Sequence, residues 1–364
     1  TLINTTTTDA QERPDIAVAA DGSYVVVWAS QNQDGDGSGI YAQRFDAAGS
    51  AFTGEILVNT STTGDQQNPL VAIDDAGNFV VVWETDHLGS GFFNIYAQRF
   101  DAAGNTLGGE FRVDAVAGGD VINASVAMDA DGDFVIAFEN HVNHDGDGWG
   151  IYARHYDNTG ASQGGGFLVN TTTTGNQSAP SVAMEDAGNF VIAWGGSDMS
   201  ILTQRYDNAG NELGGETVIT GSGFNASVSM NGSGEFVVAW QDSDSSSWGI
   251  SARQYDATGT AVGTAFRVNT LETDDQVFPD VALADNGEFV VTWQSYSQDA
   301  AGTYGIYAQR YEALVTAVDG ETLVNATTAG GQIRAAVAID DSGRVAVTWA
   351  GNGDGDADGI SVKR

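Results

Sequence analysis

The stretch "GNFVVVWET" at residues 77–85 decides the fold of this 364-residue chain, because close copies of it recur along the whole length. The copies are "GSYVVVWAS" at 22–30, "GDFVIAFEN" at 132–140, "GNFVIAWGG" at 188–196, "GEFVVAWQD" at 234–242, "GEFVVTWQS" at 287–295 and "GRVAVTWAG" at 343–351. Their aromatic residues, Trp28, Trp83, Phe138, Trp194, Trp240, Trp293 and Trp349, are separated by 55, 55, 56, 46, 53 and 56 residues. Such a period is typical of propellers and solenoids.

Each repeat reads as four strands without a helical period. In the first repeat we expect strands at 16–21, 24–28, 39–46 and 55–59, separated by turn sequences and one acidic loop. The second strand is apolar on both faces, which predicts that it is buried between layers. Four short strands in each of seven repeats predict an all-β fold, a seven-bladed β-propeller with four-stranded blades.

The two ends of the chain complement each other. Residues 1–4, "TLIN", match the fourth strand of other repeats, and "GISVKR" at 359–364 matches a third strand. We therefore expect the N-terminal strand to close the last blade and remove an open sheet edge. The expected blades of this single domain, residues 1–364, span 15–60, 69–115, 124–171, 180–220, 226–270, 280–326, and 335–364 together with 1–5.

Composition restricts the class of partner. The chain has 49 acidic and 13 basic residues and a net charge of −36, so nucleic acid and anionic lipid, which need cationic contacts, are not expected to bind. It has no cysteine and no apolar run of about 18 residues, so we expect neither disulfides nor membrane insertion. An acidic chain with a single lysine that begins at Thr1 predicts a secreted or cell-surface piece of a larger protein.

The loops between the second and third strands carry an oxygen-rich series in three repeats. In an antiparallel blade these loops emerge on the same side as the links between blades, a side we name the upper face. Asn or Asp stands at every second position: Asn32, Asp34 and Asp36; Asn143, Asp145 and Asp147; Asn352, Asp354, Asp356 and Asp358. This spacing resembles the first half of an EF-hand loop and predicts calcium as the cofactor. The alternative is a turn that simply stays solvated.

Aromatic residues end several of the same loops. Phe93, Trp149, Trp248 and Tyr304 stand just before the third strand of their repeats. Sugars present apolar ring faces and hydroxyl edges, so aromatic rings beside carboxylates and amides predict a glycan-binding surface. In the alternative reading, each ring packs onto its own blade.

The histidines and the arginines are distributed differently along the repeats. The third repeat concentrates His141, His144 and His155, with Glu139 close by, which leaves acid–base chemistry open without a recognised catalytic motif. Arginines recur along the third strands at Arg44, Arg99, Arg205, Arg310 and Arg364, with Arg154 and Arg253 shifted by one. A charge repeated in nearly every blade predicts ties between blades or to turns, and the repeated tryptophans predict core positions.

The pattern "GNFVVVW" followed by "GIYAQRFDAAG" resembles the repeats of large secreted bacterial proteins that carry RTX-type calcium-binding or adhesin segments. The resemblance implies an extracellular, calcium-associated binding or adhesion module without a catalytic set. The leading interpretation is therefore a non-enzymatic propeller whose calcium-ordered loops contact polysaccharide or surface glycan. Two alternatives stay open: a polysaccharide-degrading enzyme of lyase type with its chemistry near blade 3, and a structural spacer of a large surface protein.

Overall fold

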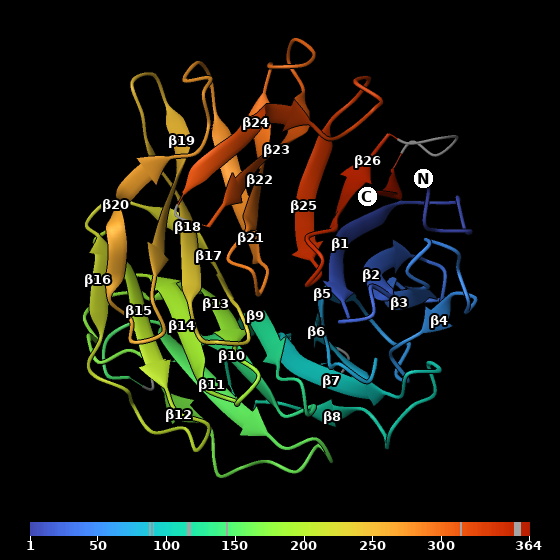
Figure 1. Ribbon diagram of the computed structural model, residues 1–364. Coiled ribbons are helices and arrows are strands. Elements are labelled where there is room, and N and C mark those ends of the chain that lie inside the picture. The colour runs from blue at the N-terminus through green and yellow to red at the C-terminus, as the bar shows by residue number, and fades with distance from the viewer. Residues whose placement is uncertain (87–88, 90, 115–117, 143–144, 314, 353–357) are drawn as a thin grey trace.

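The computed structural model describes residues 1–364 except 87–88, 90, 115–117, 143–144, 314 and 353–357. The described residues form seven antiparallel sheets arranged as blades around a central channel (Figure 1), which confirms the predicted all-β, seven-bladed propeller. Within this part of the chain, no helix is long and apolar enough to cross a membrane.

Strands follow one another from the channel outward in every blade. Blades 1 to 4 contain β1 (Gln11–Val18), β2 (Tyr24–Gln31), β3 (Ser38–Phe45) and β4 (Ile56–Leu57); β5 (Gln66–Ile73), β6 (Phe79–Thr85), β7 (Asn94–Phe100) and β8 (Phe111–Arg112); β9 (Val121–Met128), β10 (Phe134–Asn140), β11 (Gly150–Tyr156) and β12 (Phe167–Leu168); β13 (Ser178–Met184), β14 (Phe190–Gly195), β15 (Ile201–Tyr206) and β16 (Thr217–Thr220). Blades 5 to 7 contain β17 (Phe224–Met230), β18 (Phe236–Ser243), β19 (Trp248–Tyr255) and β20 (Ala261–Arg267); β21 (Gln276–Leu283), β22 (Phe289–Tyr296), β23 (Tyr304–Glu312) and β24 (Thr316–Leu323); β25 (Gln332–Ile339), β26 (Val345–Gly351) and β27 (Gly359–Lys363).

The innermost strand of blade 1 differs from the expected one. It runs from Gln11 to Val18, whereas the sequence predicted a strand over 16–21. The pairing register with β2 shifts between Glu12 and Asp15, so Arg13 and Pro14 form a bulge within the strand and do not end it. Residues 20–22 instead form the turn to β2.

The N-terminus closes the ring, as predicted. Leu2 pairs with Ser361 of β27, the Ile3 N–H donates to the carbonyl of Ile360 at 2.8 Å, and the Val362 N–H donates to Thr1 at 2.9 Å. The last blade is thus completed by a segment from the other end of the chain, next to the C-terminus (Figure 1).

Hydrophobic layers lie between neighbouring blades. Trp194 of blade 4 is fully buried and belongs to one cluster with Val135 and Ala137 of blade 3. The layer that joins blades 7 and 1 contains Trp28 together with Ile360. The seven repeated aromatic residues have exposed fractions between 0% and 6%, which confirms their predicted place in the core.

A paired Asn and Gln fasten four of the links to the blade that follows. In blade 1 the Asn59 Oδ1 accepts the Ile40 N–H at 2.7 Å, and its Nδ2 donates to the Gln66 Oε1 of blade 2 at 3.0 Å. At the closure Asn4 repeats this arrangement with the Ile360 N–H at 2.8 Å and the Gln11 Oε1 at 2.9 Å. The non-covalent joint therefore uses the same polar contacts as three of the covalent links.

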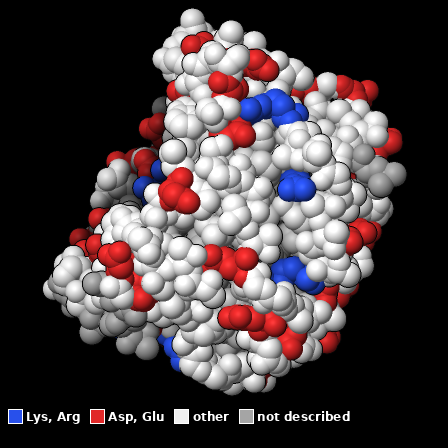
Figure 2. Space-filling model, turned by 90° about the vertical axis from the view of Figure 1, so that its left-hand side faces the viewer, with Lys and Arg blue, Asp and Glu red and all other residues white. Residues whose placement is uncertain are grey.

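Arginines of the third strands tie blades together, as their repetition predicted. Arg44 donates to the carbonyl of Ala102 in blade 2, Arg205 to Thr258 in blade 5 at 2.5 Å, and Arg364 to Ala47 in blade 1 at 2.6 Å. Arg310 instead pairs with Glu288 of its own blade. On the side of the molecule that Figure 2 shows, acidic side chains are scattered over the surface among fewer basic ones.

The closing joint generates a prediction. Replacing Asn4 with Ala should leave the buried N–H of Ile360 without its acceptor and lower the free energy of unfolding by roughly 1–3 kcal/mol. Amide hydrogen exchange should also become faster at Ile3 and Val362, because the terminal segment frays first.

The matched control is Asn325→Ala in blade 6, where Asn325 accepts the Ile306 N–H at 2.7 Å inside a covalently continuous link. This variant should lose similar stability without faster exchange at the termini. Unchanged terminal exchange in Asn4→Ala would show that the N-terminal segment is held by other contacts.

Candidate functional site at the channel mouth

A cavity of about 580 Å³ within the described residues opens at the mouth of the central channel. It is lined by the first few residues of the innermost strands, close to the links that enter each blade, so it lies on the upper face. A cavity of this size is typical of sites for small molecules or for a few residues of a polymer.

One residue of each innermost strand projects its side chain into this mouth from a β-bulge. The pairing register with the second strand shifts at this point in all seven blades. Bulges re-aim side chains and are common beside active sites. We name the seven residues the bulge ring; in blade order they are Arg13, Asn68, Asn123, Ala179, Asn225, Phe278 and Arg334.

Every member of the bulge ring has a left-handed backbone, with φ between 49° and 56°. Asn adopts this conformation readily, whereas for Arg, Ala and Phe it costs on the order of 1 kcal/mol or more. All four prolines of the chain, Pro14, Pro69, Pro180 and Pro279, directly follow a ring residue. Proline has no backbone N–H to donate to a neighbouring strand. At a bulge in the edge strand beside the channel, this missing donor costs no hydrogen bond between strands.

In blades 2 and 3 the residue after the core aromatic holds the bulge of the next blade. The carboxylate of Glu84 accepts the backbone N–H of Asn123 at 2.7 Å, and that of Glu139 accepts the N–H of Ala179. Glu84 also accepts the Asn68 amide at 2.8 Å, and burial raises its pKa. These two acidic side chains therefore stabilise the strained backbone of the bulges by accepting its N–H groups.

Two carboxylates lie just inside the mouth, two residues after the ring positions of blades 1 and 6. Asp15 accepts the Val71 N–H at 2.8 Å and Asp280 the Val337 N–H at 2.8 Å, so each binds the following blade. Both line the channel. Burial, and then the charge of Asp280, raise the pKa of Asp15 to about 7, and burial also raises the pKa of Asp280.

The Asn and Asp series of the β2–β3 loop is bound to the neighbouring link. The Asp34 Oδ2 accepts the Asn59 amide at 3.2 Å, and the Asp36 Oδ2 accepts the Gly64 N–H at 3.3 Å. Asn32 donates to Asp9 at 3.4 Å. The series is therefore part of a polar contact between loop and link.

Blade 3 repeats this arrangement, and blade 7 is described only in part. Asp145 accepts the Asn170 amide at 3.2 Å and Asp147 the Gly175 N–H at 3.4 Å. Asn352 donates to the carbonyl of Ala329 at 2.8 Å, and the carbonyl of Asp358 accepts the Gln11 N–H at 3.0 Å. Asn143, Asp354 and Asp356 lie outside the described residues.

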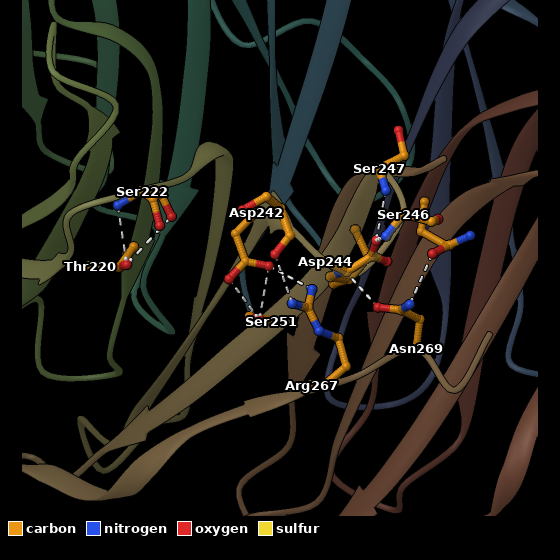
Figure 3. A network of polar contacts seen from close by, with 12 residues as sticks. Thr220, Ser222, Asp242, Asp244, Ser246, Ser247, Ser251, Arg267 and Asn269 are labelled. Atoms are coloured by element: carbon orange, nitrogen blue, oxygen red, sulfur yellow. Dashed lines mark hydrogen bonds and ion pairs between the residues drawn. The ribbon is translucent and has the colours of Figure 1, made fainter. Parts of the chain in front are cut away.

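Blades 2 and 5, which lack the series, carry an arginine beside the corresponding loop. Arg267 donates to Asp242 at 2.6 Å, next to Asp244 and Asn269 (Figure 3), and Arg112 pairs with Asp114. Blades 1 and 3 have Leu57 and Leu168 at the position of this arginine. Blades 4 and 6 lack both the series and this arginine, with Val218 and Leu323 at the same position.

The donor set for a cation is incomplete. Among the described residues, no three carboxylate or imidazole groups come together as a metal site. Calcium accepts backbone and amide oxygens and water as well as carboxylates, so Asp34 and Asp36 could contribute to such a site but would not complete it. Calcium binding by these loops stays a prediction.

The four predicted ligand-binding aromatics do not gather at the mouth. Trp149 is 37% exposed and stacks on His141 with 3.9 Å between ring centroids. Trp248 packs edge-on against Phe224 at 5.2 Å, and Tyr304 against Tyr296 at 5.1 Å. Phe93 is half-buried. Each of the three paired rings contacts a ring of its own blade, and none of the four lines the channel-mouth cavity.

A His–Glu pair connects blade 3 to the ring. The Glu139 Oε2 lies 2.9 Å from the His141 Nε2, and its Oε1 accepts the amide of Asn123 at 2.9 Å. Glu139 is 1% exposed, so it orients the imidazole from a buried position. The pair could position His141 as a base or as a hydrogen-bond donor; neither residue lines the cavity, but Glu139 contacts Asn123, which does. His144 lies outside the described residues.

Asp15 makes stability depend on pH. Its pKa is about 7 in the folded protein and 3.8 ordinarily, so the folded state holds the extra proton between these values. Stability should therefore fall as pH rises from about 4 to 7, and Asp15→Asn should stabilise the protein at pH 8 but hardly at pH 4. Because the channel leaves the carboxylate partly solvated, we expect on the order of 2 kcal/mol by chemical denaturation.

Asp101→Asn is the control of opposite sign, because hydrogen bonds from Asn105 and the turn lower the pKa of that exposed carboxyl. Its wild-type carboxylate should stabilise the fold above pH 4 and lose this effect below. Parallel pH profiles for wild type and Asp15→Asn would refute the assignment.

Calcium has its own test. If the loops bind it, the melting temperature should be higher in millimolar calcium than in a chelator, because a ligand of the folded state stabilises it. The Asp34→Asn/Asp36→Asn variant should lose part of this difference, whereas Asp46→Asn on the opposite face should keep it. Equal melting temperatures in calcium and chelator would remove calcium from these loops.

No protein-family model and no curated protein matches this sequence. Solved structures are similar in fold. A protein of unknown function from Dyadobacter fermentans has a TM-score of 0.58 at 12% identity, over 85% of this chain and 96% of that one. An α-L-arabinanase from Penicillium chrysogenum complexed with arabinobiose gives 0.55 at 14%, over 100% and 98%. The polysaccharide lyase Uly1 gives 0.54 at 10%, over 99% and 90%. At these identities the likeness concerns the propeller fold alone.

Proposed function

We propose that this propeller binds a polysaccharide or surface glycan in the cavity at the mouth of its channel. The observation that carries the proposal is the bulge ring, which presents three amides, two guanidinium groups and one aromatic ring to a cavity of about 580 Å³. In this proposal the residues of the bulge ring bind the ligand, in place of the loop aromatics that the sequence predicted.

The chemistry of the ring suits a sugar. Amide side chains at Asn68, Asn123 and Asn225 can donate to and accept from hydroxyl groups. Phe278 is 54% exposed and offers an apolar face against which a sugar ring can stack. An exposed phenylalanine in a left-handed conformation has no evident stabilising role, and strained residues cluster at functional sites.

Structural neighbours support the same class of ligand. The arabinanase was crystallised with arabinobiose, and the second neighbour is a polysaccharide lyase. The resemblance of the repeats to those of large secreted bacterial proteins is consistent with an extracellular glycan partner. In this proposal the acidic loops of the upper face surround the bound polymer, with calcium as their proposed cofactor.

Phe278→Asn tests the site with little disturbance of the backbone, because Asn occupies the same position in blades 2, 3 and 5. Among neutral and acidic polysaccharides, those that bind the wild type should bind this variant about tenfold more weakly by calorimetry, because the stacking face is lost. The melting temperature should not fall, since Asn favours the left-handed backbone.

Phe52→Asn is the matched control, because Phe52 is 50% exposed but belongs to a turn away from the cavity. It should bind as the wild type does. The proposal fails if no polysaccharide binds the wild type, or if Phe278→Asn and Phe52→Asn bind with equal affinity. Either result would favour the interpretation of the protein as a structural spacer.

An enzymatic function of lyase type is the second candidate, and the His141–Glu139 pair favours it. A buried carboxylate that orients an imidazole near a cavity is a common arrangement for a general base. His141→Asn should then abolish the release of unsaturated sugar products while polysaccharide binding persists. Binding without any product in the wild type would leave the non-enzymatic proposal.

A further inference from the structure

Two arginines stand apart from the other basic residues of this protein. Eleven of the 13 lysines and arginines donate a hydrogen bond or form an ion pair that ties strands, turns or loops together. Arg13 and Arg334 are the other two. Within the part of the chain that the structure describes, neither guanidinium makes such a contact, and both line the channel-mouth cavity.

The two arginines belong to adjacent blades, 7 and 1, and repel each other. Burial and then the positive charge of Arg13 lower the pKa of Arg334. Like charges at short range destabilise a fold, and both residues also adopt the strained left-handed backbone. The other five blades have Asn, Ala or Phe at this position, so the bulge itself does not require arginine.

Nearby carboxylates leave these charges available. Glu84 faces Arg13, but its oxygens already accept hydrogen bonds from Asn68, Gln67 and Asn123. Glu12 faces Arg334 from the exposed edge of β1. Asp15 and Asp280 lie deeper, where burial favours their neutral forms.

The opposite end of the channel has the reverse character. Asp75, Asp186, Asp285 and Asp341 line a cavity of about 110 Å³ there. Burial and then mutual repulsion raise the pKa of Asp186 and Asp341. The unpaired positive charge of the channel is thus confined to the upper mouth, next to Phe278.

We propose that Arg13 and Arg334 form an anion subsite that takes a carboxylate or sulfate group of an acidic polysaccharide. The inference rests on the proposed function and names its substrate class. Guanidinium groups bind both anions with two parallel hydrogen bonds, and desolvation inside a cavity strengthens such charge-assisted bonds. Phe278, the neighbour of Arg334 in the bulge ring, would stack on the sugar ring that carries the charge.

The general acidity of the protein does not oppose this assignment. At physiological salt, exposed charges farther away than about 8 Å are largely screened. The ligand group therefore responds chiefly to the two guanidinium groups in the cavity. The negative charge of the remaining surface weakens non-specific binding of acidic polymers there. Binding at the channel mouth is therefore favoured over binding elsewhere on the surface.

The test compares the variant Arg13→Asn/Arg334→Asn with wild type on three polymers: polygalacturonate, a sulfated galactan and neutral arabinan. Asn retains the left-handed backbone that it has in three other blades. We expect at least about a tenfold loss of affinity for an acidic polymer and an unchanged affinity for arabinan. Loss on polygalacturonate alone assigns a carboxylate, and loss on the galactan alone assigns a sulfate.

Arg253→Gln is the matched control, because it removes a positive charge outside the cavity, where the guanidinium donates to the carbonyl of Gly263 and lies over the Tyr255 ring. It should bind all three polymers as the wild type does. The double variant should melt no lower than the wild type, because a repulsive pair is removed.

Three results would overturn the inference. A double variant that melts markedly lower would make the arginines structural. An equal loss on neutral arabinan and on the acidic polymers would make them part of a general sugar site and leave the proposed function intact. Wild-type protein that binds none of the three polymers would remove the proposed function together with this inference.

Discussion

Each hydrophobic layer that the structure describes lies between two neighbouring blades, and the rest of the architecture depends on this constraint. Val135 and Ala137 of one sheet cover Trp194 of the next, and the same arrangement recurs around the ring. A single blade would expose apolar groups on both faces, so stability requires a full circle. The seventh layer joins Trp28 to Ile360 across the ends of the chain, which explains why a terminal segment is held there.

The fold could be predicted because every blade must satisfy the same burial. An apolar run with one aromatic residue is needed in each repeat, so the period is visible in the sequence. The candidate site could not be read in this way. The ring residues Arg13, Asn68 and Phe278 share a backbone conformation but differ in side-chain chemistry. Because repeats are aligned by similar residue types, these three positions do not stand out as equivalent in the sequence. Each of the four prolines follows a ring residue, and this spacing is the one signal in the sequence that marks the bulge position.

The charged residues have different roles in the channel and in the blades. Arginines such as Arg205 end on backbone carbonyls of the neighbouring blade and act in place of further apolar packing. Glu84 and Glu139 hold strained amides in the bulges. Arg13 and Arg334 do neither. A site that combines like charges with a left-handed backbone lowers the stability of the fold locally. The large hydrophobic layers between the blades compensate for this loss. Such a balance is expected where binding has been selected over stability.

The bulge ring also has an evolutionary consequence. Its seven positions share one backbone geometry, yet four residue types, Arg, Asn, Ala and Phe, occupy them. Because all four residue types adopt the same bend, a substitution there changes the chemistry of the mouth without rebuilding a strand. Specificity can therefore change by one blade at a time, and propellers with nearly the same framework could diverge toward different polymers through a handful of point mutations.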